Sequence, residues 1–392
     1  MTTCVFLNSP LWGHVNPTLA VVQELVRRGH QVYYYLTEEF RATIEATGAH
    51  FEPYELAHGP HELGRAVANL QDLREVPATV LDRVRAQAPA VIIYDFFCIW
   101  AQSLIEQLQI SGIMLRSTYA SNEHYKSMEN VPGSAEWKGR FEAMVASQIG
   151  SDEAKTAFLR DMFSMFTAFG HFNIIFIPRF FQPMEETFDD RFVFVGPSLL
   201  PRHQEIAFPF EQLRTDFPLL YISMGTVFNN QPDFYRHCFE AFGDQPWQVV
   251  LNRGKRIDAT RLGPVPTNFL LSPYVPQLEI LQRARIFVTH GGANSVMESM
   301  YYGVPMVIIP QQPEQRMSAQ RIVDLGLGVQ LDKDAVTATV LRNAVERIAQ
   351  NSLYHEQAQV LRQATRDAGG YERAVDAIIQ YTQEYTNSLR RE

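Results

Sequence analysis

Short apolar runs alternate with stretches of helical spacing along the first half of the chain. Residues 4–8 (CVFLN) and 30–36 (HQVYYYL) are nearly continuous apolar runs, and residues 17–28 between them repeat apolar positions at helical spacing. Such runs predict buried strands, and a period near 3.6 residues predicts a helix. Asn16 and Pro17 are typical of the cap and first position of a helix. The chain therefore begins with a predicted strand, helix and strand.

The same alternation continues and then restarts. A helix from about Glu38 stops near Gly48, 90–96 (AVIIYDF) is a predicted strand, and 99–110 (IWAQSLIEQLQI) is a predicted helix. Residues 196–218 are rich in proline and polar residues and predict a linker. The second half then offers further predicted strands at 219–225 (LLYISMG), 247–252 (WQVVLN), 285–290 (RIFVTH) and 305–310 (PMVIIP), with a helix at 233–242.

Length and alternation together predict the fold class. The 392 residues exceed what one hydrophobic core normally serves. Apolar strands alternating with helices indicate a parallel sheet covered on both faces. We expect an α/β protein of two tandem doubly wound Rossmann-like domains that face each other across a cleft. Ligands of such sheets bind beyond the carboxyl ends of the strands, so polar residues at those ends are the candidates for function.

Composition excludes several classes of partner. The net charge of −9, without a basic cluster, argues against a nucleic-acid partner. Cys4, Cys98 and Cys238 are too few and too far apart for a disulfide framework or a metal site, which favours a reducing, cytoplasmic location. The N-terminus lacks the features of a signal peptide. The chain is expected to act without a nucleic acid and in the cytoplasm.

The longest segment without an acidic or basic residue is 162–178 (MFSMFTAFGHFNIIFIP). It is short for a membrane span and is interrupted by Gly170, His171 and Asn173, so we expect no stable membrane insertion. A core helix that runs into a strand is the favoured interpretation. Peripheral membrane contact or a pocket for a substrate are the alternatives.

The stretch THGGANSVMES, residues 289–299, follows a predicted strand and opens a predicted helix. Gly291 and Gly292 would let the backbone approach a ligand, and a helix that starts near Asn294 or Ser295 would attract an anion at its N-terminus. The spacing of Ser295 and Glu298 also fits a capping box, which needs no ligand. By itself the stretch is compatible with a phosphate site and with a simple helix cap.

Polar residues also follow other predicted strands. His14 lies just past the first strand and Asp95 ends the strand at 90–96, so both belong to one rim of the first sheet, where a His–Asp pair is possible. A histidine near a helix start is often structural, and that alternative stays open. Residues 311–315 (QQPEQ) place amide and carboxylate groups after another strand, which suits sugar hydroxyls or a solvated loop.

These motifs identify a family. On GHVNPTLAVVQELVRRGHQV, ISMGT, VPQLEIL, THGGANSVMESMYYGVPMVIIPQQPEQ and DLGLGVQL, the chain resembles end to end the family 1 glycosyltransferases of the GT-B fold, in the bacterial macrolide-glycosyltransferase branch. The resemblance implies transfer of a hexose, glucose from UDP-glucose, to antibiotics, flavonoids or other phenolics. It implies an acceptor domain at 1–205, a donor domain at 206–370 and a C-terminal helix at 371–392 that returns to the first domain.

The resemblance also implies a donor site. Its residues would be Thr226, Tyr274, Val275, Gln277, His290, Gly292, Asn294, Ser295, Glu298, Glu314 and Gln315. Tyr274 stands where plant relatives have a tryptophan that stacks on uracil, Gln277 would hold the nucleoside, and Glu298 would accept from the ribose hydroxyls. His290, Gly292, Asn294, Ser295 and Thr226 would hold the diphosphate. Glu314, where many relatives have Asp, and Gln315 would bind the transferred sugar.

For the first domain, the resemblance implies that His14 is the general base and that Asp95 orients it. Attack of an acceptor hydroxyl from the face opposite UDP would invert the anomeric carbon and give a β-O-glycoside. No metal or other cofactor is expected, and Asp189–Asp190 are interpreted as turn residues. The candidate acceptor-binding residues are Trp12, Tyr119, His124 and Phe172, within an apolar surrounding that suits a hydrophobic, hydroxylated small molecule.

Three other functions are alternatives for this sequence. A GT-B nucleotide-sugar epimerase would share the donor domain without needing the pair of His14 and Asp95. A nicotinamide dehydrogenase would need G-x-G-x-x-G after a strand with an acidic residue about twenty positions on, and the chain has no such motif. A binding protein with a decayed site is disfavoured because the histidine, the aspartate and the donor motif are all intact.

Overall fold

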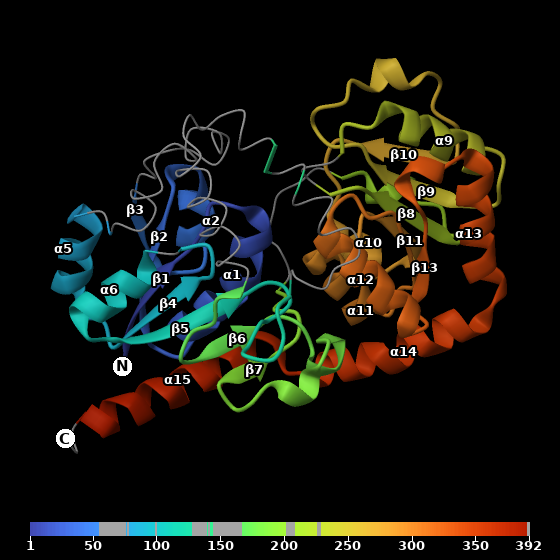
Figure 1. Ribbon diagram of the computed structural model, residues 1–392. Coiled ribbons are helices and arrows are strands. Elements are labelled where there is room, and N and C mark those ends of the chain that lie inside the picture. The colour runs from blue at the N-terminus through green and yellow to red at the C-terminus, as the bar shows by residue number, and fades with distance from the viewer. Residues whose placement is uncertain are drawn as a thin grey trace. The chain divides into compact units, whose positions relative to one another are not determined.

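The chain divides into two compact units. The computed structural model describes residues 1–54, 76, 78–98, 100–127, 139, 142–143, 167–200, 208–225 and 229–389. Met1–Leu200 and Ala368–Glu392 form the first unit, and Pro201–Asp367 form the second. The division between units therefore lies after residue 200, close to the expected 205, and the C-terminal segment joins the first unit. Each unit is an α/β structure around one parallel sheet (Figure 1).

The first sheet has seven parallel strands in the described residues. They are β1 (Thr3–Leu7), β2 (Gln31–Leu36), β3 (His50–Pro53), β4 (Val91–Asp95), β5 (Ser111–Arg116), β6 (Asn173–Ile175) and β7 (Phe192–Phe194). Their order is β3-β2-β1-β4-β5-β6-β7. The chain winds outward from β1 to β3, returns, and winds the other way from β4, so β1 and β4 are paired neighbours at the point where the strand order reverses.

Helices cover both faces of this sheet. They are α1 (Trp12–Arg27), α2 (Arg41–Glu45), α5 (Ala78–Gln87), α6 (Ala101–Leu108) and α15 (Gly370–Leu389). Side chains of α1 and α15 share one core with β1, β2 and β4, and side chains of α5 and α6 share the other (Figure 1). Alternate residues of β4 point into the two cores, as a strand buried on both faces requires.

The second sheet repeats this design. Its described strands are β8 (Leu219–Ser223), β9 (Gln248–Asn252), β10 (Phe269–Ser272), β11 (Ala284–Thr289), β12 (Met306–Ile308) and β13 (Gly328–Gln330), all parallel, in the order β10-β9-β8-β11-β12-β13. The strand order reverses between β8 and β11, which are paired. The helices are α9 (Pro232–Phe242), α10 (Gln277–Leu281), α11 (Ala293–Tyr302), α12 (Pro313–Asp324), α13 (Ala338–Gln350) and α14 (Ser352–Asp367). Buried side chains of α9 and α13 pack on one face of the sheet.

The prediction that the first long helix starts at Asn16–Pro17 is wrong. The helix α1 begins at Trp12, and Pro17 lies inside it. Pro17 lacks the N–H that would reach the carbonyl of residue 13, but only that one bond is missing. The first turn is closed by the Val15 N–H, which donates to the Leu11 carbonyl at 3.0 Å. The burial of Val15 against the sheet adds a tertiary contact that local propensity does not include.

Other short elements also differ from the prediction. The expected helix at 38–48 divides into a 3₁₀ turn, Glu38–Phe40, followed by α2. The strands β3, β7, β10 and β13 were not predicted, since they have only three or four residues each and too few to show a period. Of the segment 162–178, residues 162–166 lie outside the described residues, and the strand into which it was expected to run is β6.

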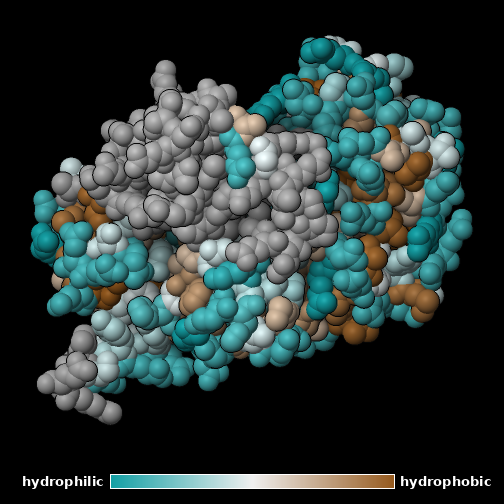
Figure 2. All heavy atoms as spheres, in the orientation of Figure 1, coloured by the Kyte–Doolittle hydropathy of each residue, from teal (hydrophilic) through white to brown (hydrophobic). Residues whose placement is uncertain are grey.

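No helix in the described part of the chain is long and apolar enough to cross a membrane. On the face shown in Figure 2 most described residues are hydrophilic, and hydrophobic residues appear in small groups over both units.

The C-terminal helix α15 belongs to the core of the first unit. Its Ala374, Val375 and Ile378 are buried with residues of α1 and the sheet. The ring of Tyr381 stacks on Phe172 with ring centroids 4.4 Å apart. This helix therefore completes a face of the first sheet although it follows the whole second unit in sequence.

We expect Ile378→Ala to destabilise the first unit by about 2 to 5 kcal/mol, because a fully buried side chain leaves a cavity when it is truncated. Chemical denaturation followed by tryptophan fluorescence measures the change. Val360→Ala on α14 is the control, since Val360 is 62% exposed and should have little effect. Equal effects of the two substitutions would show that α15 contributes no core packing.

Candidate active site

His14 and Asp95 form a close pair at the carboxyl edge of the first sheet. The distance from His14 Nδ1 to Asp95 Oδ2 is 2.7 Å, and the side chains are 14% and 3% exposed. Because the Asp95 carboxylate accepts a hydrogen bond from His14 Nδ1, that nitrogen carries the proton and Nε2 has the free lone pair. Within the described part of the chain, no group hydrogen-bonds to Nε2. The arrangement is that of a histidine prepared to accept a proton at Nε2.

The sheet topology brings the two residues together. His14 lies in the first turn of α1, which follows β1, and Asp95 is the last residue of β4. The two strands are paired in parallel, with Leu7 beside Tyr94, so their carboxyl ends are adjacent. The sequence prediction that His14 and Asp95 share this rim is therefore confirmed, although 81 positions separate them.

The second oxygen of Asp95 is also held. Asp95 Oδ1 accepts from the Ser9 hydroxyl at 2.8 Å and from the Phe97 backbone N–H at 3.0 Å. Sequence reasoning did not identify Ser9. Its only signal was its place directly after a strand that ends in the same rim.

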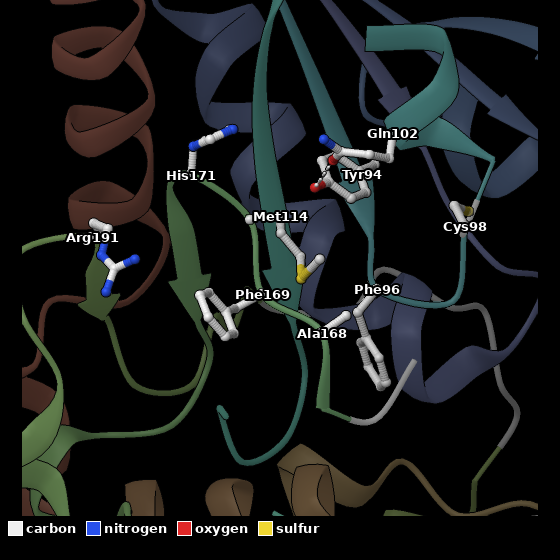
Figure 3. A pocket seen from close by; sticks show the side chains of 10 residues that line it. Tyr94, Phe96, Cys98, Gln102, Met114, Ala168, Phe169, His171 and Arg191 are labelled. Carbon is white, nitrogen blue, oxygen red and sulfur yellow. Dashed lines mark hydrogen bonds between the residues drawn. The ribbon is translucent and has the colours of Figure 1, made fainter. Parts of the chain in front are cut away.

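Aromatic rings surround the pair. The His14 ring lies 4.7 Å from Phe97 and 5.3 Å from Phe96, measured between centroids. The buried Arg116 guanidinium lies over the Phe96 ring at 4.5 Å. Phe96 also lines a cavity of about 330 Å³, together with Tyr94, Met114 and Phe169 (Figure 3). This cavity, lined in part by apolar side chains, therefore extends to Phe96, which is next to Asp95 in the sequence.

The four candidate acceptor residues lie in different surroundings. Trp12 is 42% exposed, two residues before His14, and packs on Phe40. Tyr119 is buried and stacks on Phe181.

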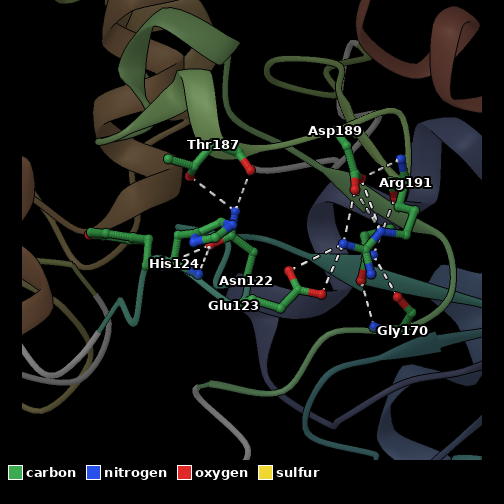
Figure 4. Close-up of polar contacts among 9 residues, drawn as sticks. Asn122, Glu123, His124, Gly170, Thr187, Asp189 and Arg191 are labelled. Atoms are coloured by element: carbon green, nitrogen blue, oxygen red, sulfur yellow. Dashed lines mark hydrogen bonds and ion pairs between the residues drawn. The ribbon is translucent and has the colours of Figure 1, made fainter.

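His124 is exposed, in a polar loop where its backbone N–H donates to Asn122 Oδ1 (Figure 4). Phe172 stacks on Tyr381 of α15 and does not line the described cavity, which instead receives Phe169, Gly170 and His171 from the same segment. Of the four candidates, only Trp12 combines exposure with closeness in sequence to His14.

In the second unit, His290 lies at the carboxyl edge of the sheet, where the strand order reverses between β8 and β11. It follows β11, and Gly225 follows the paired β8. A Cβ on Gly225 would lie 2.6 Å from His290 Cε1, and a Cβ on Gly292 would lie 2.6 Å from His290 Nε2. Gly225 also has a φ of +74°, which disfavours other residues. The two glycines are therefore needed for this position of the imidazole. Thr226 lies outside the described residues.

Desolvation lowers the pKa of His290 from its usual 6.5 to about 4. At neutral pH the ring is therefore uncharged and offers a single N–H donor. The expectation that His290 neutralises a bound diphosphate requires that the anion itself raise this pKa.

Gly292 is the N-cap residue of α11 and, having no side chain, makes no capping hydrogen bond itself. The capping-box interpretation of Ser295 and Glu298 is wrong: Ser295 is already inside the helix, and the Glu298 carboxylate accepts from Gln277 Nε2 at 2.6 Å. The N-terminal N–H groups of a helix favour an anion. Gly292, Asn294 and Ser295 lie together at this helix end.

Gln277 connects three elements of the second unit. Its Oε1 accepts from the Tyr221 hydroxyl at 3.0 Å, and its Nε2 donates to Ser295 Oγ at 3.3 Å as well as to Glu298. Glu298 is only 2% exposed. The network fixes a buried carboxylate close to the N-terminal end of α11.

Other candidates flank this network. Val275 is buried, and the backbone carbonyl of Tyr274 accepts from Ser272 Oγ at 2.5 Å, so the segment before α10 is fixed. Glu314 and Gln315 lie in the first turn of α12, after β12. Gln315 Oε1 accepts from the Gln311 N–H at 2.7 Å, so one end of this side chain holds the loop.

No group of three or more His, Cys, Asp or Glu residues suited to a metal ion occurs among the residues that the structure describes. Asp189 pairs with Arg191, which also reaches Glu123 (Figure 4). The interpretation of Asp189 as a turn residue agrees with this ion pair.

Comparisons with known proteins give a consistent result. A model of the family described as UDP-glucoronosyl and UDP-glucosyl transferase matches residues 202–375. NDP-glycosyltransferase YjiC of Bacillus licheniformis is 38% identical over 390 residues, which cover 95% of each chain. Demethyllactenocin mycarosyltransferase of Streptomyces fradiae is 32% identical over 405 residues, with 96% of this chain and 86% of that protein covered. The crystal structure of the calicheamicin glycosyltransferase CalG4 matches with a TM-score of 0.78 at 29% identity, over 97% of this chain and 98% of that chain.

The desolvated His290 should make stability depend on pH. The unfolded chain binds a proton at residue 290 near pH 6.5 and the folded chain only near pH 4, so stability is lost as the pH falls through this window. Urea unfolding at about pH 7.5 and about pH 5 should show a smaller acid loss for His290→Gln than for the unchanged protein. His124→Gln, at an exposed position, is the control. An unchanged acid loss in His290→Gln would contradict a desolvated ring.

Proposed function

The chain belongs to the family 1 UDP-glycosyltransferases, and on that premise we propose that it is an inverting hexosyltransferase. Its two parallel-sheet units are the Rossmann-like domains of the GT-B fold. The proposed reaction moves glucose from UDP-glucose to a hydroxyl of a lipophilic small molecule, such as a macrolide, flavonoid or other phenolic, and yields a β-O-glycoside. The observation that carries the proposal is the 2.7 Å contact between His14 and Asp95.

In the proposed reaction His14 and Asp95 act as the catalytic pair. His14 Nε2 takes the proton of the acceptor hydroxyl, and the Asp95 carboxylate stabilises the imidazolium that forms. The acceptor oxygen forms a bond to the anomeric carbon of the sugar while the bond from that carbon to the diphosphate oxygen breaks. Because the nucleophile enters opposite the leaving UDP, the configuration inverts.

The second unit supplies the groups for the donor. The N–H groups at the start of α11 and the neutral His290 are suited to the diphosphate. The buried Glu298 carboxylate, fixed by Gln277, is suited to accept from ribose hydroxyls. We place the transferred sugar at Glu314 and Gln315 and the uracil ring near Tyr274. These backbone and side-chain donors offset the negative charge of the leaving group, so the proposal needs no metal or other cofactor.

The acceptor is proposed to be lipophilic because the His14 ring is bordered by Phe96 and Phe97 and preceded by the exposed Trp12. Flat aromatic surfaces favour apolar partners with one hydroxyl directed at the base. The names of the relatives, which include an NDP-glycosyltransferase and a mycarosyltransferase, also support acceptors among natural products. The epimerase alternative is not favoured, since it leaves the His14–Asp95 pair without a task. Three free cysteines, all buried, support the cytoplasmic location that we propose.

His14→Ala should abolish transfer while UDP still binds. Loss of a general base lowers kcat by about 10² to 10⁴-fold, whereas the groups proposed for UDP lie in the other unit. UDP release from UDP-glucose in the presence of a phenolic acceptor measures kcat, and calorimetry measures UDP binding. His50→Ala, at the exposed first residue of β3, is the control. Full activity of His14→Ala would refute the proposed base.

UDP should stabilise the protein, and transfer should continue, in excess EDTA. A ligand at a hundred times its Kd stabilises the folded state by about 2.7 kcal/mol. Thermal unfolding with UDP, dTDP and NAD added separately tests the nucleotide, with NAD as the negative control. Glu298→Gln should reduce the UDP effect. Strict dependence of transfer on magnesium would contradict the metal-independent reaction. An unfolding temperature unchanged by both UDP and dTDP would contradict the proposed donor site.

A further inference from the structure

Two consecutive polar residues, Asn8 and Ser9, follow directly after β1. Both are buried, with 1% and 8% exposure. A buried polar side chain normally needs a hydrogen-bond partner, so the partners of these two residues indicate what they hold. Each of them reaches one member of the catalytic pair, and by a different route.

Ser9 reaches Asp95. Its hydroxyl donates to Asp95 Oδ1 at 2.8 Å, while Oδ2 of the same carboxylate faces His14 Nδ1 at 2.7 Å. With the Phe97 N–H also on Oδ1, the carboxylate is held at both oxygens and its plane is fixed. The Ser9 donor also draws negative charge toward Oδ1, away from the oxygen that faces the imidazole.

Asn8 reaches the backbone of His14. Its Nδ2 donates to the His14 carbonyl at 3.2 Å and to the Tyr34 hydroxyl at 2.6 Å, and its Oδ1 accepts from the Ser9 N–H at 2.7 Å. The Tyr34 hydroxyl also bonds Thr18 Oγ1 at 2.7 Å, one turn further along α1. The turn of α1 that carries the base is therefore attached to β1 through a buried amide.

Several ionisable side chains close to the pair among the described residues are uncharged. Burial raises the pKa of the hydroxyls of Tyr34 and Tyr54 and of the Cys98 thiol, so all three are neutral at physiological pH. Arg116 is a cation close to Asp95, and its guanidinium lies against the Phe96 ring and donates to the carbonyls of Tyr119 and Ala168. The hydrogen bond from Ser9 is therefore a main control on the charge that Asp95 presents to His14.

We propose that Asn8 and Ser9 are positioning residues of the catalytic pair: Ser9 orients the Asp95 carboxylate and tempers its charge, and Asn8 fixes the turn that presents His14. The inference rests on the proposed function, in which His14 is the base. Neither residue touches the substrate. Their effect reaches the reaction only through the direction of the imidazole ring and its proton affinity.

Ser9→Ala tests the first half of the inference. Without the Ser9 donor, Asp95 presents more negative charge to His14, and the His14 imidazolium is held more strongly. In an NMR titration of the ligand-free protein, the midpoint for His14 should lie at a higher pH in Ser9→Ala than in the unchanged protein. The acid limb of kcat/KM should move in the same direction, and kcat should fall about fivefold.

The matched control is Ser111→Ala. Ser111 is equally buried in the first unit, and its hydroxyl donates to the Ala90 carbonyl at 3.1 Å, at the opposite end of the sheet. It should lower stability like Ser9→Ala without moving either the titration or the pH profile. Equal titrations of His14 in Ser9→Ala and in the unchanged protein would overturn the role of Ser9.

Asn8→Asp tests the second half, because the side chain keeps its shape but places an oxygen opposite the His14 carbonyl. We expect kcat to fall and the KM for the nucleotide sugar to stay constant, since the groups proposed for the donor lie in the second unit. A folded Asn8→Asp protein with unchanged kcat would overturn the role of Asn8. If this variant does not fold, Asn8→Ala, which removes the same amide donor without adding a charge, replaces it with the same two outcomes.

The titration also separates this inference from the proposed function. It is measured without substrate, so a shifted His14 in Ser9→Ala supports the positioning role even for a protein with no transferase activity. An active His14→Ala variant would refute the proposed base and leave the Ser9 titration unaffected. Transferase activity with an unshifted titration would refute the positioning role alone.

Discussion

The parallel pairing of strands at the two reversals of strand order is the constraint on which both candidate sites depend. In the first sheet β1 pairs with β4, and in the second β8 pairs with β11. At such a place the connections leave the neighbouring strands toward different parts of the sheet, so the rim between them is not covered by a crossover. Side chains that end these strands therefore meet at an open edge although they are far apart in sequence.

Polar groups at these edges are held by neutral donors. Asp95 receives hydrogen bonds from a serine hydroxyl and a backbone N–H in addition to its contact with His14. Glu298 receives the amide of Gln277, which is itself held by Tyr221. Such partners fix the direction of a buried carboxylate without cancelling its charge. A charge that is fixed and not cancelled remains available to a reacting histidine or a ligand hydroxyl.

In the second unit, a side chain packs closely against the backbone of two glycines. The His290 ring fits between Gly225 and Gly292 because neither has a Cβ. The desolvation that results lowers the pKa of the ring to about 4 and makes it a neutral donor. The two glycines thus set both the position and the pKa of the His290 side chain.

Much of this was predictable from the sequence, because strand and helix periods, strand-end positions and family motifs are local properties. They predicted the strands β1, β2, β4, β8, β9, β11 and β12, the two units, and the pair formed by His14 and Asp95. The start of α1 at Trp12 and the partner of Glu298 were not predictable, because each depends on a contact between segments distant in the chain. Local rules placed a cap at Asn16 and a capping box at Ser295, and tertiary contacts gave both segments other partners.

The sequence by itself determined which residues could do chemistry and on which rim they lie, since a strand end is set by the pattern of the strand that precedes it. Only the tertiary structure decided how those residues are held: Ser9 on Asp95, Asn8 on the carbonyl of His14, and His290 between two glycines. The physical reason is that a hydrogen bond or a steric contact acts over about 3 Å in space, and the register of parallel strands sets which distant residues come that close.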